Sequence, residues 1–505
     1  MIYPMKKEIF YFLISIVFFA LSFPAFGFWP LSFVALVPFF TILNSKDHYS
    51  RKNIFLLSFL FGANTSAILL SVAFSKYLLM FCTLVLIYGL LFGLFGIIYI
   101  QLKKKTIYTI FLFASLWVIF EWVRQLIFQD FDYTTISYTS YALPQLLSFA
   151  AIGGRYLVSF IIALINAFLG YSLLHGVNKK FKKVFIGSLC IIVSLYVTNK
   201  IYLSSGDKSG HEVSFSTMQV KEFFSPYSEM QNGKLVLNTE IERLTEESIQ
   251  KHADYIIYPY NFVNHAITTK DNPLQKTYIN AYFEDVDATL KKIIPKNTTF
   301  IFWTDDLKKG DDIKIYDETE FWQNGTTTNY YQKRSIHPFY DITSDYFRNF
   351  RVINQPYDYT ASKEDKIIAI GNERFSNLNC SELNYTYLAR HDRNLGANII
   401  LSVGYSSVFE HPVIGESNLV LVQLRAIETG VPVIRADIRG PSVFVDKNGI
   451  IISKMNVDQN NILFQRLFIE DNPQKTIYVL FGDYLFITLL FIFITYFYFY
   501  KYREE

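Results

Sequence analysis

Disulfide partners, metal-binding patterns and phosphate-binding loops are missing from this sequence, and each absence excludes a kind of chemistry. The 505 residues include only three cysteines, two of them in apolar runs, so no disulfide is expected within the polar part of the chain. The eight histidines show no metal-ligand spacing and no glycine-rich phosphate loop occurs, so no metal or cofactor is expected. Charged residues make up 18% of the chain and form no basic stripe with interleaved aromatics, which argues against nucleic acid as a partner.

Long apolar runs are the dominant feature instead. A bilayer core about 30 Å thick needs about 20 apolar residues in a helix. Eight runs are interpreted as membrane spans: 9–23, 29–43, 54–74, 78–100, 108–128, 156–174, 184–202 and 477–500. The first run follows Lys6 and Lys7 in the manner of a signal peptide, but no small-x-small cleavage site follows it. It is therefore interpreted as a retained helix.

Lysine and arginine gather in alternate loops, which sets the predicted orientation. The positive-inside rule then places both termini in the cytoplasm. It places residues 204–475, which have the mixed polarity of a soluble domain, on the far side of the membrane, which is the periplasm if the source is a diderm bacterium. The predicted domains are a seven-span helical domain at 1–203, an exported domain at 204–475, and a final span with a short cytoplasmic tail at 476–505.

The exported domain alternates short β-branched or aromatic runs with helical patterns, which favours an α/β fold. Strands are expected at 213–220, 254–260, 298–303, 366–370, 397–403, 431–436, and 442–445 with 450–453. Helices are expected at 233–252, 279–294, 382–395 and 419–429, the last ended by Gly430. Residues 446–449 are predicted to form the hairpin turn between the last two strands.

Two residues of the exported domain are candidates for chemistry. Cys380 lies where the segment 375–379 ends and a predicted helix begins, and the positive end of a helix dipole favours the thiolate. Neighbouring N–H groups could also hold an oxyanion. Lys333, in the polar segment 331–339, is either an ordinary surface charge or a cation that steadies a tetrahedral oxyanion. Spacing alone does not bring Lys333 to Cys380.

Several segments of the chain have the form of sequence motifs. In the apolar part these are Phe23-Pro24 with Phe26-Gly27-Phe28-Trp29-Pro30, Phe120-Glu121-Trp122-Val123-Arg124, and Gly153-Gly154-Arg155-Tyr156. In the exported part they are 331–339, Asn379-Cys380-Ser381-Glu382 and 424–436. These segments resemble motifs of the apolipoprotein N-acyltransferases, a family within the nitrilase, or carbon–nitrogen hydrolase, superfamily. The resemblance covers the whole chain, including the order of spans, exported domain and final span.

The resemblance implies a four-layer αββα sandwich and a catalytic set of Cys380, Lys333 and Glu382. It implies that the cysteine takes a fatty acyl chain from a phospholipid as a thioester. The chain then passes to the N-terminal amine of a diacylglyceryl-cysteine lipoprotein. It further implies a multi-pass protein of the bacterial inner membrane that works as a monomer.

The chain departs from the family's pattern at the site itself. Tyr260 stands where the family has its general-base glutamate, and a phenol with an unperturbed pKa of about 10 is a poor base at neutral pH. Asp341, a candidate auxiliary group, stands where a glutamate is usual, and Ser381 replaces an aromatic residue. The alternative is therefore a pseudoenzyme or paralogue that uses the fold to bind a lipid or protein partner. An amidase is a weaker third reading, because eight spans would be needless for a soluble amide substrate.

Overall fold

The computed structural model groups the chain into two compact units. It describes residues 3–45, 50–74, 78–104, 106–127, 133–206, 208–219, 227–231, 234–237, 239–263, 292–309, 313–336, 358–405, 412–438, 440–455 and 460–501. The helical unit consists of Met1–Gly206, Glu416–Glu428 and Lys475–Glu505, and the sheet unit of Asp207–Gly415 and Thr429–Gln474. The domain division drawn from the sequence stays a prediction. It assigned Glu416–Glu428 to the exported domain and not to the helical unit.

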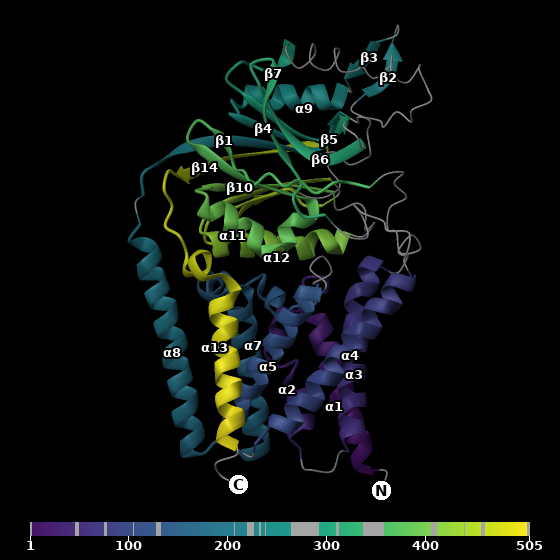
Figure 1. Cartoon of the computed structure of the whole chain (residues 1–505), viewed down its shortest axis with the longest axis vertical. Helices are drawn as coiled ribbons and strands as arrows, with labels where there is room; N and C mark the ends of the chain where they lie inside the picture. The colour runs from purple at the N-terminus through teal and green to yellow at the C-terminus, as the bar shows by residue number, and fades with distance from the viewer. Residues whose placement is uncertain are drawn as a thin grey trace. The chain divides into compact units, whose positions relative to one another are not determined.

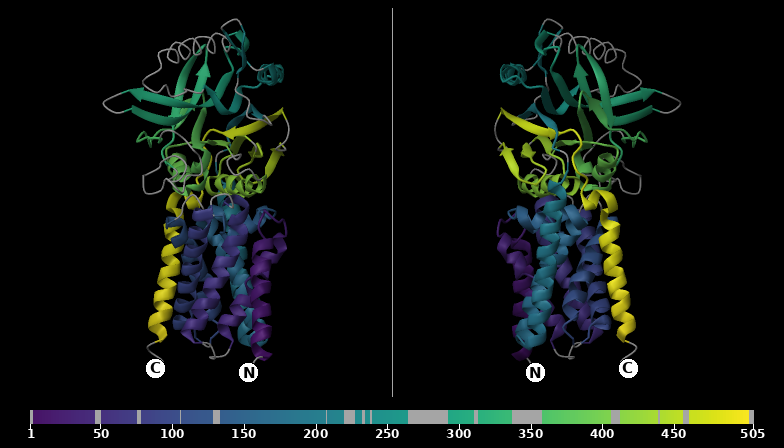
Figure 2. Two further views of the ribbon diagram at one scale, coloured as in Figure 1. Left: turned by 90° about the vertical axis from the view of Figure 1, so that its right-hand side faces the viewer. Right: turned by 90° about the vertical axis from the view of Figure 1, so that its left-hand side faces the viewer.

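Helices of the helical unit follow the apolar runs of the sequence. The long ones are α1 (Tyr3–Leu21), α3 (Arg51–Phe74), α4 (Leu78–Leu102), α5 (Thr109–Ile127), α7 (Ala150–His175), α8 (Lys179–Ser204) and α13 (Ile477–Lys501). Shorter elements are η1 (Trp29–Phe33), α2 (Val37–Asn44), η3 (Ile136–Ser140) and α6 (Pro144–Leu147). Helix α1 begins, and α13 ends, at the same end of this unit (Figures 1 and 2).

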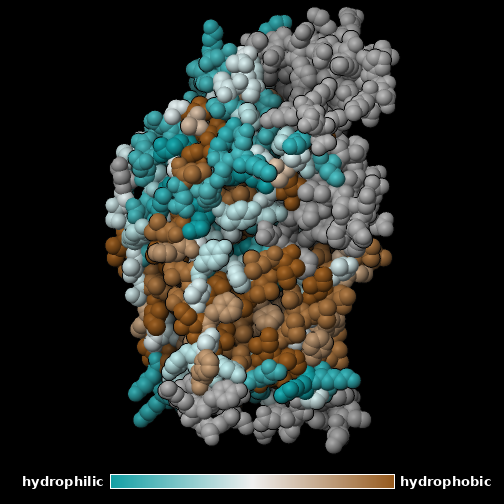
Figure 3. Space-filling view, viewed as in Figure 1, coloured by the Kyte–Doolittle hydropathy of each residue, from teal (hydrophilic) through white to brown (hydrophobic). Residues whose placement is uncertain are grey.

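Six helices among the described residues are long and apolar enough to cross a membrane. Two further apolar segments, Phe10–Leu21 and Trp29–Asn44, are shorter, and the second is split into η1 and α2 instead of forming one helix. Only 6% of the membrane-length span of α8 is buried inside the protein, so its apolar side chains face outward. Figure 3 shows apolar side chains covering this face of the helical unit. Such a surface fits lipid and not water. The count of eight spans stays a prediction.

The family-like segment 153–156 forms a break inside α7. Gly153 and Gly154 have non-helical backbone angles, and Gly154 has φ +63°. A Cβ atom at Gly154 would lie 2.5 Å from Cε2 of Tyr478 on α13, so only glycine fits. The break frees the N–H of Arg155, which donates to Oε1 of Glu428 at 3.1 Å. Arg155 therefore joins α7 to the end of α12 (Pro412–Thr429) within this unit.

Two six-stranded sheets form the sheet unit. The first has the order β14-β1-β4-β5-β6-β7, and the second β13-β12-β11-β10-β9-β8. The first sheet contains β14 (Asn461–Glu470), β1 (Gly210–Gln219), β4 (Tyr255–Val263), β5 (Thr299–Lys309), β6 (Ile313–Gln323) and β7 (Thr326–Gln332). The second contains β13 (Ile451–Lys454), β12 (Val443–Val445), β11 (Val433–Ile438), β10 (Ile399–Tyr405), β9 (Glu373–Asn379) and β8 (Ile368–Ile370). A separate hairpin pairs β2 (Tyr227–Gln231) with β3 (Lys234–Leu237).

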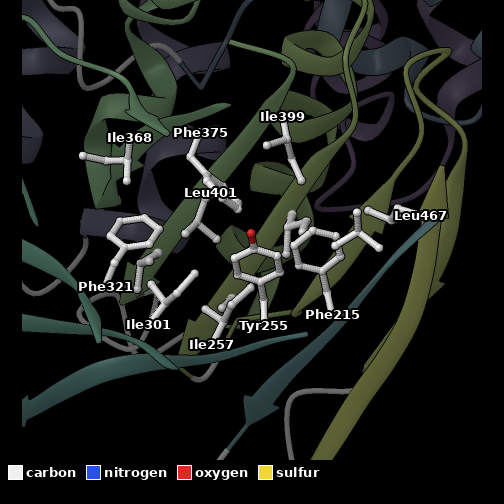
Figure 4. Close-up of a cluster of buried hydrophobic side chains, with 14 of the residues drawn as sticks. Phe215, Tyr255, Ile257, Ile301, Phe321, Ile368, Phe375, Ile399, Leu401 and Leu467 are labelled. Atoms are coloured by element: carbon white, nitrogen blue, oxygen red, sulfur yellow. The ribbon is translucent and has the colours of Figure 1, made fainter. Parts of the chain in front are cut away.

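The two sheets pack face to face around one hydrophobic core. The first sheet contributes Phe215, Tyr255, Ile257, Ile301 and Phe321, and the second contributes Phe375, Ile399 and Leu401 (Figure 4). A second core lies between the other face of the first sheet and α9 (Thr239–Gln250) and includes Ile241, Leu244, Ile256, Phe300 and Trp322. Helix α11 (Thr386–Asn394) packs against β9 of the second sheet. The order of these layers is helix, sheet, sheet, helix.

Sequence reasoning found the apolar central strands but missed the polar ones. The predictions at 213–220, 254–260, 298–303, 397–403 and 431–436 match β1, β4, β5, β10 and β11. No strand was predicted for β6, β7, β9 or β14, whose alternating polar side chains hide the pattern. The predicted helix 233–252 begins only at Thr239, because β3 takes its first part. The predicted helix 279–294 lies almost wholly outside the described residues.

Two turn predictions are confirmed. Helix α12 ends at Thr429, and Gly430 follows with φ +71°, the left-handed conformation of a helix C-terminal glycine. The turn between β12 and β13 is closed by the N–H of Gly449 donating to the carbonyl of Asp446 at 2.9 Å. Gly449 has φ +78°, which a glycine adopts without a steric penalty.

Candidate active site

Cys380 occupies a sharp turn at the end of β9. It is the first residue of the 3-10 helix η5 (Cys380–Asn384) and has φ +50°. A left-handed conformation costs a non-glycine residue about 1–2 kcal/mol. The thiol is partly exposed, whereas the residues on either side of the turn, Asn379 and Glu382, are buried. A strained and partly exposed cysteine between buried neighbours is the placement that a nucleophile requires.

Glu382 holds this turn against the segment that carries Lys333. Its Oε2 accepts the N–H of Asn379 at 2.9 Å, and its Oε1 accepts the N–H groups of Arg334 at 2.8 Å and Ser335 at 3.0 Å. The phenol of Tyr331 also donates to Oε2 at 2.8 Å. Glu382 is fully buried. One carboxylate therefore joins the residues beside the cysteine to those beside the lysine.

Burial sets the protonation of Glu382. Removal from water raises the pKa of its carboxyl to about 7, although the nearby Lys333 ammonium and the N–H donors of Ser335 and Asn379 act in the opposite direction. Both oxygens are taken by the protein's own donors. The geometry makes Glu382 a residue that positions the turn, in agreement with the capping role that its sequence position also allows.

Lys333 lies directly after β7 and is only 2% exposed. Its N–H donates to the carbonyl of Asp317 on β6 at 2.8 Å. Its ammonium Nζ lies 3.6 Å from Oδ2 of the same aspartate. The reading of Lys333 as an ordinary surface charge is therefore wrong. Its distance from the Cys380 sulfur stays a prediction.

Arg334 anchors the same segment on its other side. Its two terminal nitrogens donate to Oδ1 and Oδ2 of Asp392 at 2.8 and 2.7 Å, a bidentate pair. Asp392 is fully buried in α11 and also accepts the hydroxyl of Ser376 at 2.7 Å. Residues 333–335 thus have fixed positions between β6, η5 and α11.

Two predicted site residues cannot be placed as side chains. Tyr260 lies within β4, where the pairing with β5 is irregular between Tyr258 and Asn261. This irregularity lies beside Trp303, the β5 partner of Asn261. The side chain of Tyr260 and the whole of Asp341 lie outside the described residues. Both assignments stay predictions.

Sequence reasoning missed Asp317. It is buried on β6, and its Oδ1 accepts the indole N–H of Trp303 at 2.7 Å and the Nδ2 of Asn379 at 2.8 Å. A signal was available in the alternation of β6, where Asp317 falls in register with the inward residues Ile315 and Phe321. A charged residue on a buried face is retained where it has a specific partner.

One group of described side chains has the spacing of a metal site: Asp365, His391 and Asp392. The guanidinium of Arg334 donates to both carboxylates of this group, at 3.0 Å to Asp365 and 2.8 Å to Asp392. A protein cation therefore already occupies the centre of the cluster, and the group is accounted for as an ion-pair network.

The other charged residues of the family-like segments serve the scaffold. Arg425 pairs with Glu428 at 2.8 Å in the helical unit, and Arg435 pairs with Asp437 in the sheet unit. Glu121 accepts the indole N–H of Trp117 at 3.0 Å and the N–H of Ile136 at 2.8 Å. Arg124 donates to the hydroxyl of Thr135 at 2.8 Å.

Fold and site together define a class: a chain with membrane-length apolar helices and an α/β sheet unit that holds a strained cysteine and a buried lysine, in segments joined by Glu382. Comparisons with known proteins agree. A family model described as the apolipoprotein N-acyltransferase N-terminal domain matches residues 15–168. This match and those of the relatives below confirm that the chain resembles the apolipoprotein N-acyltransferases.

The relatives align over most of their length. Apolipoprotein N-acyltransferase 1 of Treponema denticola is 22% identical over 93% of this chain and 91% of its own. The enzymes named apolipoprotein N-acyltransferase from Rickettsia bellii and Pasteurella multocida are 23% and 22% identical, over 75% and 95% of this chain and 74% and 93% of their own. A carbon–nitrogen hydrolase of Helicobacter pylori is 16% identical, covering 51% of this chain and 89% of its own, with a TM-score of 0.38.

Proposed function

We propose that this chain is an N-acyltransferase that moves a fatty acyl chain from a phospholipid to the N-terminal amine of a diacylglyceryl-cysteine lipoprotein. The observation that carries the proposal is the turn at Cys380, whose backbone is in the left-handed conformation. Glu382 links this turn by hydrogen bonds to the segment that carries Lys333. The names of its relatives supply the substrate class.

The proposed reaction has two steps. In the first, the Cys380 thiolate attacks the carbonyl carbon of a phospholipid ester, and the Lys333 ammonium stabilises the oxyanion of the tetrahedral intermediate. The ester C–O bond breaks, the lysophospholipid oxygen takes the proton that the thiol gave up, and a thioester remains on Cys380. In the second, the acceptor amine attacks the thioester carbon. An amide C–N bond forms as the thioester C–S bond breaks, and the departing cysteine sulfur takes a proton from the amine.

The position of the protein follows from the same proposal. Both proposed substrates are lipids at the outer surface of the membrane. The sheet unit is therefore expected on the outer side of a bacterial inner membrane. The ends of α1 and α13 at one end of the helical unit fit a cytoplasmic location for both termini (Figure 1). A monomer suffices for this chemistry, since each proposed catalytic group belongs to one chain.

The presence of Tyr260 in place of the general-base glutamate favours a second candidate function. A site without its general base should lose on the order of 10²–10⁴ in rate. A protein that retains the fold and binds a lipid or a protein partner without turnover would show the same replacement.

A transfer assay separates the two. The full-length protein in phospholipid vesicles is incubated with a synthetic diacylglyceryl-cysteine peptide, and the acylated peptide is measured by mass spectrometry. We expect slow acylation that Cys380→Ala abolishes. The matched controls are Cys82→Ala and Cys190→Ala, exposed thiols of the helical unit, which should leave the rate unchanged. Acylation that survives Cys380→Ala would refute the role of Cys380 as nucleophile, and no acylation at all would favour the binding protein.

A further inference from the structure

Asp317 is a charged residue in the middle of an apolar interface. It lies on β6 in register with the buried Ile315 and with Phe321, which belongs to the core between the two sheets, and is only 2% exposed. An ionised carboxylate in such a place is retained only where donors and opposite charge replace water. Its partners therefore show what it is for.

Those partners come from three other elements. Its Oδ1 accepts from the indole of Trp303 on β5 at 2.7 Å and from the amide of Asn379 at the end of β9 at 2.8 Å. Its Oδ2 lies 3.6 Å from the Lys333 ammonium. The amide of Asn379 is fixed in orientation, because its Oδ1 accepts the hydroxyl of Thr319 at 2.8 Å. One carboxylate thus touches both the cation of the site and the residue that precedes the nucleophile.

Burial gives this contact an electrostatic role. An ammonium as buried as that of Lys333 loses its proton readily unless an opposite charge stays nearby. Two carboxylates among the described residues meet this need, Asp317 on β6 and Glu382 on η5. Glu382 has both oxygens occupied by the phenol of Tyr331 and by backbone N–H groups. The guanidinium of the adjacent Arg334 is engaged by Asp392. Of these two described carboxylates, Asp317 forms the ion pair with Lys333, at 3.6 Å.

We propose that Asp317 is a positioning residue of the acyl-transfer site. It keeps Lys333 charged and oriented beside Cys380, and it supplies a buried carboxylate in a chain whose position 260 carries a phenol in place of a glutamate. This proposal rests on the function proposed above and deepens it. Asp317 acts through Lys333 and Asn379 and has no contact of its own with substrate.

The test measures the thiolate of Cys380 without any acyl transfer. Full-length protein in detergent, with Cys82→Ala and Cys190→Ala, is alkylated with iodoacetamide between pH 5 and 10. In Asp317→Asn the lysine loses the counter-charge of Asp317, holds its proton less tightly and stabilises the thiolate less. The alkylation midpoint should then rise by about one pH unit, which slows alkylation about tenfold below the midpoint. Asp317→Glu should fall between Asp317→Asn and the parent protein.

The matched control is Glu318→Gln. Glu318 is the next residue on β6 and is also buried, but it accepts from Gln332 at 2.8 Å on the other face of the sheet. Its midpoint should equal that of the parent. An unchanged or lower midpoint in Asp317→Asn, or an equal rise in Glu318→Gln, would overturn the proposal.

A Lys333→Met background tests whether Asp317 works through the lysine. Adding Asp317→Asn to Lys333→Met should leave the midpoint where Lys333→Met alone puts it. A further rise would show that Asp317 acts elsewhere and would refute the proposal. The double variant also lacks the buried ammonium of Lys333, so it remains testable if Asp317→Asn alone fails to fold. Failure of the acyltransferase function is seen separately, as absence of acyl transfer in a parent protein whose Cys380 alkylates normally.

Discussion

Glu382 offers the sharpest test of how the candidate site is built. Its carboxylate receives three backbone N–H groups, those of Arg334, Ser335 and Asn379, and the phenol of Tyr331. Glu382→Ala removes the acceptor for all of them at once. Each buried donor left without a partner costs about 1–3 kcal/mol, so the three N–H groups together cost about 3–9 kcal/mol. Domains are stable by about 5–15 kcal/mol, so Glu382→Ala should unfold the site or the whole sheet unit.

Glu382→Gln is the milder change. A glutamine keeps one oxygen, which can serve Arg334 and Ser335, while its NH₂ group then faces the N–H of Asn379. The phenol of Tyr331 can rotate to accept, so one N–H is left unpaired, at about 1–3 kcal/mol. Both variants should lower the thermal midpoint of the full-length protein in detergent, glutamine by several degrees and alanine by much more.

The pH dependence of stability gives a second signature of Glu382. Burial raises its pKa in the folded protein from 4.5 to about 7, so the folded state binds this proton more tightly than the unfolded state. Stability contributed by this group is therefore full below pH 4.5 and falls as pH rises to about 7, by about 3 kcal/mol.

Thermal unfolding of wild type and Glu382→Gln across that range measures the difference, and the slope of the wild type should exceed that of the variant. Equal slopes, or a glutamine variant as unstable as the alanine one, would refute this account of the turn.

Three further predictions concern the base, the helical unit and the topology. Restoring a carboxylate with Tyr260→Glu should raise the rate of peptide acylation, whereas Tyr260→Phe, which changes the phenol alone, should leave it low. Arg425→Met removes the cation that pairs with the buried carboxylate of Glu428 and should destabilise the protein by about 3–5 kcal/mol in thermal unfolding. The loss of stability should be smaller when Glu428→Met is added. Reporter fusions at Lys104 and at Asn272 should report opposite sides of the membrane, and the same side for both would contradict the orientation.

The sequence predicts the apolar parts of this protein better than the polar ones. Apolar runs identify the long helices because a span of about 20 such residues has few other uses. Central strands such as β10 and β11 are found because they are buried on both faces and read as continuous β-branched runs. Strands β6 and β7 escape because threonine, asparagine and charged residues interrupt them.

The same difference governs the site. Cys380 and Lys333 are found through family-like segments, and a half-exposed thiol at a turn can be anticipated from its position before a helix. Asp317 belongs to no such segment, and its role depends on a contact with Asn379 across 62 positions of the chain. Long-range pairings of this kind follow from sheet order, which spacing along the sequence does not encode. The charge on β6 could have been noticed, but its partner could not.

An acyl group on Cys380 tests the central claim most directly. The measurement is intact-protein and peptide mass spectrometry of the Cys82→Ala/Cys190→Ala variant after incubation with phospholipid vesicles and no acceptor. We predict a mass increase of one fatty acyl chain on the peptide containing Cys380. It should be removed by neutral hydroxylamine, as a thioester is, be absent from Cys380→Ala, and increase in Tyr260→Glu. If neither the wild-type site nor Tyr260→Glu ever carries an acyl chain, the acyltransferase account is contradicted, and the chain is a binding protein on an acyltransferase fold.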